Sequence, residues 1–162
     1  MIQRIQTVYL ALVFILSFVC LISTLGAYSV QHTEVADFSN FCFTTFGLYK
    51  GYESAGPWCL GVLLILVMFL TTMSIMLYRK RMRQLRLTII STILLVGYVA
   101  CYALFAWKYG LALDDYTKGL VSVDFRPSFM AMFPVLNIIL NCLAIHGIRK
   151  DEALVRSLDR IR

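Results

Sequence analysis

Charged residues are scarce in this chain. Asp, Glu, Lys and Arg make up 15% of its 162 residues, whereas about 25% is typical of a soluble globular domain. The apolar fraction is 60%, and a water-soluble fold of this length could not bury so many apolar side chains. The shortage of charge excludes an ordinary soluble domain and indicates a protein whose solvent is partly lipid.

Residue patterns that mark catalytic and cofactor sites are missing as well. The sequence contains no C-x-x-C, G-x-S-x-G, H-E-x-x-H or P-loop pattern, which removes the usual signs of redox, serine-hydrolase, zinc-protease and nucleotide chemistry. It has two histidines, His32 and His146. We expect no catalytic residue, no metal and no cofactor, and the sequence does not favour an enzyme.

Four segments are almost free of charge. The runs 7–28, 58–78 and 87–107 contain no charged residue, and 128–148 contains only His146. A helix needs about 20 residues to cross a hydrocarbon core of about 30 Å, and only a helix satisfies its own backbone there. The sequence therefore predicts an all-α membrane protein. Residues 1–148 form a four-transmembrane-helix antiparallel bundle, and 149–162 form a cytoplasmic amphipathic tail.

The basic residues predict the orientation. Of the 15 Lys and Arg residues, 11 lie near the N-terminus, in the connection 79–86 or in the tail, and four lie in the other two loops. The positive-inside rule places both termini in the cytoplasm. The net charge of +6 is then a topology signal, and we expect the lipid bilayer and no nucleic acid as a partner. His32 and His146 fall on opposite sides, so they cannot share a metal.

The first apolar run is expected to remain as an anchor. It is longer than the core of a signal peptide, and Leu25 interrupts a small-residue cleavage motif that would end at Ala27.

The loops suggest some structure outside the membrane. Because the connection 79–86 is short and basic, the second and third helices should be antiparallel neighbours. The segments Phe41–Phe46 and Leu120–Phe125 both have strand-like composition. They either pair into a small β cap over the outer helix ends or lie as irregular loops on the lipid headgroups.

The tail has helical periodicity. Leu154, Leu158 and Ile161 follow the spacing i, i+4 and i+7, which places them on one helix face. The tail is either a continuation of the fourth helix, an amphipathic segment on the anionic leaflet, or a docking helix for a cytoplasmic partner. In each docked case the three apolar side chains should be buried.

One polar feature lies at membrane depth. Asn137 and Asn141 share a face of the fourth run at i, i+4 spacing. They serve either as hydrogen-bonding contacts between helices or as a polar site for a small ligand. The spans hold no acid or base at depth, which argues against a proton relay.

The five cysteines allow one sequence-level hypothesis. Cys20, Cys101 and Cys142 lie inside apolar runs, where small apolar packing is their expected role. Cys42 and Cys59 both fall on the outer, oxidising side of the predicted topology, so they are the candidates for a disulfide.

Both ends of the chain resemble one family. The opening MIQRIQTVYL, residues 1–10, and the ending KDEALVRSLDRIR, residues 150–162, are similar to those of small membrane proteins catalogued as domain of unknown function 4293. The resemblance implies a bacterial inner-membrane protein of Bacteroidota with four helices. It implies no activity and no site residues.

Two functions from different classes follow. The first is a structural or accessory subunit of a larger membrane assembly, with other membrane proteins as partners. The alternative is a small transporter or lipid-binding protein that uses the Asn137 and Asn141 face.

Overall fold

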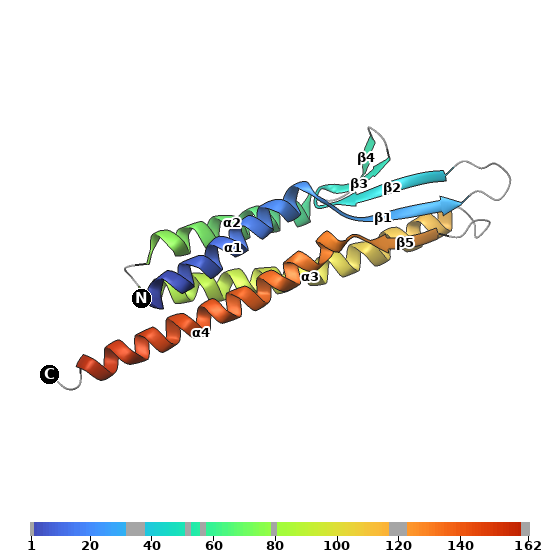
Figure 1. Cartoon of the computed structure of the whole chain (residues 1–162). Coiled ribbons are helices and arrows are strands. Elements are labelled where there is room, and N and C mark those ends of the chain that lie inside the picture. The colour runs from blue at the N-terminus through green and yellow to red at the C-terminus, as the bar shows by residue number, and fades with distance from the viewer. Residues whose placement is uncertain are drawn as a thin grey trace.

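The protein consists of four helices and a small antiparallel sheet (Figure 1). The structure is a computed structural model, and it describes residues 2–31, 38–50, 53–55, 58–78, 81–116 and 123–159. The helices are α1 (Ile2–Ile22), α2 (Cys59–Met76), α3 (Arg81–Tyr116), the short 3-10 helix η1 (Phe129–Met132) and α4 (Phe133–Asp159). The strands are β1 (Thr24–Gln31), β2 (Phe38–Thr44), β3 (Gly47–Lys50), β4 (Glu53–Ala55) and β5 (Val123–Pro127).

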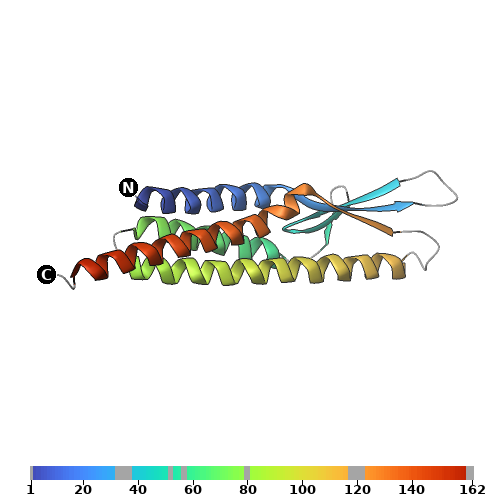
Figure 2. The ribbon, with the colours of Figure 1, turned by 60° about the horizontal axis from the view of Figure 1, so that its bottom comes forward.

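The four long helices form an antiparallel bundle. Helix α1 packs against α2 and α4, and α3 packs against the same two helices from the other side. Figures 1 and 2 show that the start of α1, the end of α2, the start of α3 and the end of α4 lie at one end of an elongated molecule. The sheet lies at the opposite end. We call these the inner end and the outer end.

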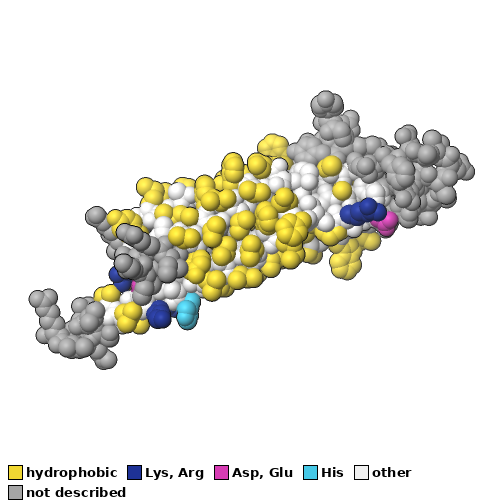
Figure 3. All heavy atoms as spheres, viewed as in Figure 1, with side chains coloured by type: hydrophobic (Ala, Val, Ile, Leu, Met, Phe, Trp, Pro, Cys, Tyr) yellow, Lys and Arg dark blue, Asp and Glu magenta, His cyan; other side chains and the backbone are white. Residues whose placement is uncertain are grey.

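Three of the helices that the structure describes are long and apolar enough to cross a membrane. Their apolar regions are Cys59–Met76, Arg81–Leu113 and Phe129–Val155, and a shorter apolar helix covers Gln6–Ile22. Exposed hydrophobic side chains cover the middle of the visible face, whereas the charged side chains coloured in Figure 3 lie toward its two ends. This distribution suits a rod whose central part is surrounded by hydrocarbon.

The first apolar run differs from the predicted helix 7–28. Helix α1 ends at Ile22, and the rest of the run enters strand β1. The side chains of Leu25 and Tyr28 on this strand are buried. An apolar run does not by itself distinguish a helix from a strand that is buried against other parts of the protein. For this reason the predicted helix end, residue 28, lies beyond the observed end at Ile22.

The β cap exists, with a different pairing from the one predicted. The sheet has five strands in the order β4-β3-β2-β1-β5, all antiparallel. Of the two segments predicted as strands, residues 41–44 fall in β2 and residues 123–125 fall in β5, whereas residues 120–122 lie outside the described residues. Strand β1 lies between β2 and β5. Tyr28 of β1 is opposite Phe41 on one side and Phe125 on the other. The all-α class was therefore too narrow for this mainly helical protein.

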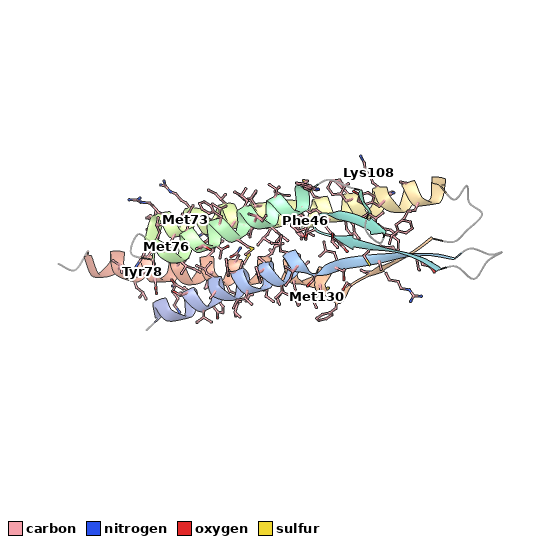
Figure 4. The ribbon with its side chains drawn as sticks, turned by 90° about the horizontal axis from the view of Figure 1, so that it is seen from above. Phe46, Met73, Met76, Tyr78, Lys108 and Met130 are labelled. Atoms are coloured by element: carbon pink, nitrogen blue, oxygen red, sulfur yellow. The ribbon has the colours of Figure 1, made fainter. Side chains whose placement is uncertain are left out.

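Helix α3 is much longer than the predicted span 87–107. Its 36 residues extend about 54 Å at 1.5 Å per residue, which exceeds a hydrocarbon core of about 30 Å. The additional C-terminal turns lie beside the sheet (Figure 1). Protein contacts there replace lipid, so the helix continues past the polar Lys108, which is exposed (Figure 4).

Helix α4 also continues beyond its predicted span 128–148. It runs without interruption to Asp159, so most of the predicted tail is a continuation of this helix. Figure 2 shows the last turns of α4 extending past the ends of its neighbours at the inner end.

Candidate functional site

A layer of hydrogen-bonded polar side chains crosses the middle of the bundle. Asn137 Nδ2 donates to Ser17 Oγ of α1 at 3.0 Å, and Asn141 Nδ2 donates to Ser91 Oγ of α3 at 3.4 Å. All four residues are buried. The i, i+4 face predicted on the fourth helix thus contacts two different helices, which links α1, α3 and α4.

The oxygen atoms of the same two amides are buried in the core but accept no hydrogen bond from the described residues. Asn137 Oδ1 and Asn141 Oδ1 are buried without a hydrogen-bond partner. A buried amide oxygen without a partner is unfavourable, because it loses its interactions with water and gains nothing in return. This layer is the strongest candidate for a site inside the bundle.

Two further polar contacts lie between this layer and the inner end. Ser74 Oγ of α2 and Thr88 Oγ1 of α3 are 3.0 Å apart. The Thr88 hydroxyl also donates to the Gln84 carbonyl at 2.9 Å. These contacts fix the register of the α2–α3 hairpin. The short connection predicted that the two helices are antiparallel neighbours, but it did not predict which residues face each other.

The buried residue Asp151 joins three helices at the inner end, through its carboxylate and its backbone carbonyl. Gln6 Nε2 of α1 donates to Asp151 Oδ2 of α4 at 3.0 Å. Arg81 of α3 donates to the Asp151 backbone carbonyl at 3.3 Å. Gly147 permits this approach, because a Cβ there would lie 3.1 Å from Gln6 Cγ. Sequence reasoning missed this contact, since nothing in the spacing relates Gln6 to Asp151.

Aromatic side chains hold the sheet to helix α3. The Tyr28 hydroxyl donates to the Ala106 carbonyl at 2.5 Å, and the Tyr102 hydroxyl donates to the Leu25 carbonyl at 3.2 Å. The Phe43 ring lies 5.6 Å from the rings of Tyr102 and Tyr109. Burial, together with the neighbouring Tyr102 and Tyr109, raises the pKa of Tyr28 to about 12. These contacts make the sheet and the outer part of α3 one packed unit.

Two glycines provide space for aromatic rings at the base of the sheet. A Cβ on Gly61 of α2 would lie 2.6 Å from Cε1 of Phe46, and a Cβ on Gly26 would lie 2.8 Å from Cε2 of Phe125. Phe46 belongs to the turn between β2 and β3, and Figure 4 shows it where the sheet meets the helices. Gly47 in the same turn has φ 130°, a conformation that favours glycine. The hairpin therefore contacts α2 directly.

The cysteines are free thiols in the part of the chain that the structure describes, and the Cys42–Cys59 disulfide stays a prediction. Cys42 and Cys59 are exposed free thiols. Cys59 is near enough to Cys101 on α3 for their side chains to interact, a pair that sequence reasoning did not consider. Spacing within the antiparallel hairpin could have suggested it, but the hairpin's register was not known.

The predicted tail face is described only in part. Leu154 has 48% of its surface exposed, and the side chains of Leu158 and Ile161 lie outside the described residues. In the part of the chain whose side chains are described, no three His, Cys, Asp or Glu residues are grouped as metal ligands.

Comparison with known families identifies the chain. The model of a domain of unknown function, DUF4293, matches residues 2–161. The chain belongs to the DUF4293 family. The match covers both terminal segments whose sequences resemble this family, and it confirms that resemblance. No curated protein matches this DUF4293 chain.

Proposed function

We propose that this DUF4293 protein is a bacterial inner-membrane protein that crosses the membrane four times, with both termini in the cytoplasm. We propose further that it is a structural or accessory subunit of a larger membrane assembly. The observation that carries this proposal is the length of α3 and α4. Helix α3 extends past the outer end of the bundle, where it supports the sheet, and α4 extends past the inner end.

The topology is supported by the arrangement of α1. This helix lies along the other three, although its apolar part is shorter than theirs. Large apolar side chains point outward from it at helical spacing: Val8, Leu12, Ile15, Phe18 and Ile22. Such a surface is suited to lipid and unsuited to water. The exposed basic residues Arg83, Arg86, Arg149 and Lys150 lie at the inner end, which supports a cytoplasmic inner end.

The accessory role is supported by what α3 and α4 carry. At the outer end, α3 supports the sheet through buried aromatic contacts. At the inner end, α4 carries Leu154 and Val155, both partly exposed, beyond the bundle. Because α4 is continuous, these side chains lie on a helix that leads away from the bundle. That position favours a cytoplasmic protein, and not the surface of the lipid leaflet, as the partner that covers these side chains.

The core supports the same conclusion. The amide donors of Asn137 and Asn141 bond to Ser17 and Ser91 within the bundle, as expected of contacts that hold helices together. Each bond of this kind contributes on the order of 0.6 kcal/mol. An accessory subunit needs such a core to hold its two end surfaces in fixed relation.

The test is purification in mild detergent with a matched pair of charge substitutions. Leu154→Asp introduces a carboxylate on the predicted docking face, whereas Ala153→Asp introduces the same charge on an exposed position of the next face. We expect specific membrane proteins to copurify with the wild type and with Ala153→Asp, and to be lost from Leu154→Asp. Equal recovery from both variants, or the absence of any stoichiometric partner, would contradict the proposal.

The second candidate is a small transporter or lipid-binding protein. The two buried amide oxygens without partners favour it, because a small hydrogen-bond donor could satisfy them. This candidate predicts that replacing Asn137 or Asn141 changes ligand uptake while copurifying proteins remain. The accessory role predicts the opposite pattern.

A further inference from the structure

The α2–α3 hairpin brings two cysteines to the same height in the bundle. Ser74 and Thr88 are in contact near the inner end of the hairpin. Cys59 lies 15 residues before Ser74, and Cys101 lies 13 residues after Thr88. At 1.5 Å per residue these separations are about 22 Å and about 20 Å along antiparallel helices. Both cysteines therefore lie near the outer end, at the base of the sheet.

Their side chains are neighbours as well. The Cys59 side chain is near enough to interact with the Cys101 thiol, and helices α2 and α3 pack against each other. Cys101 also packs on the hydrophobic cluster that contains Leu60, the residue next to Cys59. Cys59 is exposed, Cys101 is partly buried, and both are free thiols. One thiol is thus accessible to a reagent while the other is held beside it.

We propose that Cys59 and Cys101 are a redox modification site that forms an interhelical disulfide. The part of the proposal that concerns cells rests on the topology proposed above, which puts the outer end in an oxidising compartment. The pairing itself rests on the packing of α2 against α3. A bond at this position would join the first turn of α2 to α3, two residues before Gly61, which approaches Phe46.

The chemistry requires a disulfide oxidant, such as glutathione disulfide or a disulfide oxidoreductase. The exposed Cys59 thiolate attacks one sulfur of the oxidant, which forms a mixed disulfide and releases the first thiolate. The Cys101 thiolate then attacks Cys59 Sγ and releases the second thiolate. Two cysteine thiols are oxidised, the oxidant's disulfide is reduced, and the two protons remain with the two thiols formed.

Cys42 provides the competing pairing. It lies on β2, opposite Ala27 and Tyr49 on the neighbouring strands, and it is exposed. A Cys42–Cys59 bond would join the sheet to α2 instead of joining α2 to α3. The two pairings share Cys59, so the identity of the second cysteine decides between them.

The experiment uses the purified full-length protein with glutathione disulfide as the oxidant. Free thiols are blocked in denaturant, the disulfides are reduced, and the newly exposed thiols are counted by maleimide–polyethylene glycol gel shift. We expect two newly exposed thiols in the monomer. The intramolecular bond should be absent from Cys59→Ser and from Cys101→Ser, and in Cys101→Ser at most the single thiol of a Cys59–glutathione mixed disulfide should remain. Cys42→Ser and Cys142→Ser, which alter exposed cysteines, should retain both newly exposed thiols. The disulfide should raise the apparent melting temperature by about 5 °C.

Peptide mass spectrometry of the oxidised wild type identifies the bonded pair without any variant. A Cys59–Cys101 peptide supports the proposal, whereas a Cys42–Cys59 peptide or a fully reduced monomer overturns it. The same thiol count on protein trapped in intact cells then tests the compartment. A bond that forms in the purified protein but is absent in cells would contradict the proposed outer location while leaving the pairing intact.

Discussion

At the scale of single residues, the asparagines show how a polar group is accommodated at membrane depth. Asn137 and Asn141 each direct one amide hydrogen to a serine on another helix, while their oxygens have no partner. Removing one partner of a buried bond costs more than replacing both with apolar groups, because the remaining group is left unsatisfied. This asymmetry makes the Asn137–Ser17 pair testable.

We predict that Ser17→Ala destabilises the protein and that adding Asn137→Leu recovers much of the loss. The coupling between the two positions should be on the order of 0.6 kcal/mol, as for other interhelical bonds in membranes. Steric trapping or reversible unfolding in mixed micelles can measure the four members of the cycle. A coupling energy of zero would show that the bond does not hold α1 to α4.

Tyr28, on strand β1, should make the stability of the fold depend on pH. Burial, assisted by Tyr102 and Tyr109, raises its pKa to about 12, whereas a tyrosine in an unfolded chain has a pKa of about 10. The folded state therefore retains the phenol proton more strongly than the unfolded state. The resulting stabilisation is complete below about pH 10 and is lost as the pH rises toward 12.

Tyr28→Phe should remove this dependence. At neutral pH the variant should be less stable by about 1 kcal/mol, because the hydrogen bond to the Ala106 carbonyl is lost. Between pH 10 and pH 12 the melting temperature of the wild type should fall more steeply than that of the variant. Parallel curves over this range would mean that Tyr28 ionises equally in both states.

At the scale of the elements, the junction between the sheet and the helices depends on close approach. The β2–β3 turn rests on α2 because Gly61 leaves room for the Phe46 ring. Glycine in a helix costs about 1 kcal/mol relative to alanine. That cost is offset here by a contact that a larger residue would prevent.

We predict that Gly61→Ala displaces the Phe46 turn and weakens the outer sheet. Overpacking of this kind typically costs about 1–3 kcal/mol, which outweighs the gain in helix propensity. Gly97→Ala on α3 is the matched control, because nothing lies within 4 Å of a Cβ at that position. It should be neutral or stabilising. Limited proteolysis from the outer side should cleave only Gly61→Ala faster, and equal rates for both variants would refute the role of this contact.

At the scale of the whole molecule, the two ends differ in chemistry. The outer end carries a sheet with an aromatic core, and the inner end carries basic residues and the buried contact between Gln6 and Asp151. The bundle between them has large apolar side chains on its surface. This arrangement, with charged residues toward the ends and an apolar middle, is the one that the proposed topology requires.

The proposed topology predicts opposite accessibility for two single-cysteine variants. One retains only Cys42, which is exposed on the sheet, and the other carries only Ala153→Cys on the inner part of α4. A membrane-impermeant maleimide should label the first variant in spheroplasts and the second only after the membrane is opened. If both variants are labelled from the same side, the four-span topology is wrong.

The sequence by itself determined the features that lipid imposes. Four apolar stretches of spanning length, a tight basic hairpin and a basic excess at one end are visible in composition, because hydrocarbon excludes charge along continuous segments. Helix α2 accordingly falls inside the predicted run 58–78. The strand-like segments were also recognisable, since β-branched and aromatic residues mark them.

The tertiary structure decided what depends on partners distant in the chain. The end of α1 and the length of α3 follow from the contact of Tyr28 with Ala106, 78 residues apart. The partner of Asn137 is Ser17, 120 residues away, and Cys59 interacts with Cys101, which lies on another helix. Local spacing gives each side chain a face, but the packing of whole helices determines which other side chain meets that face.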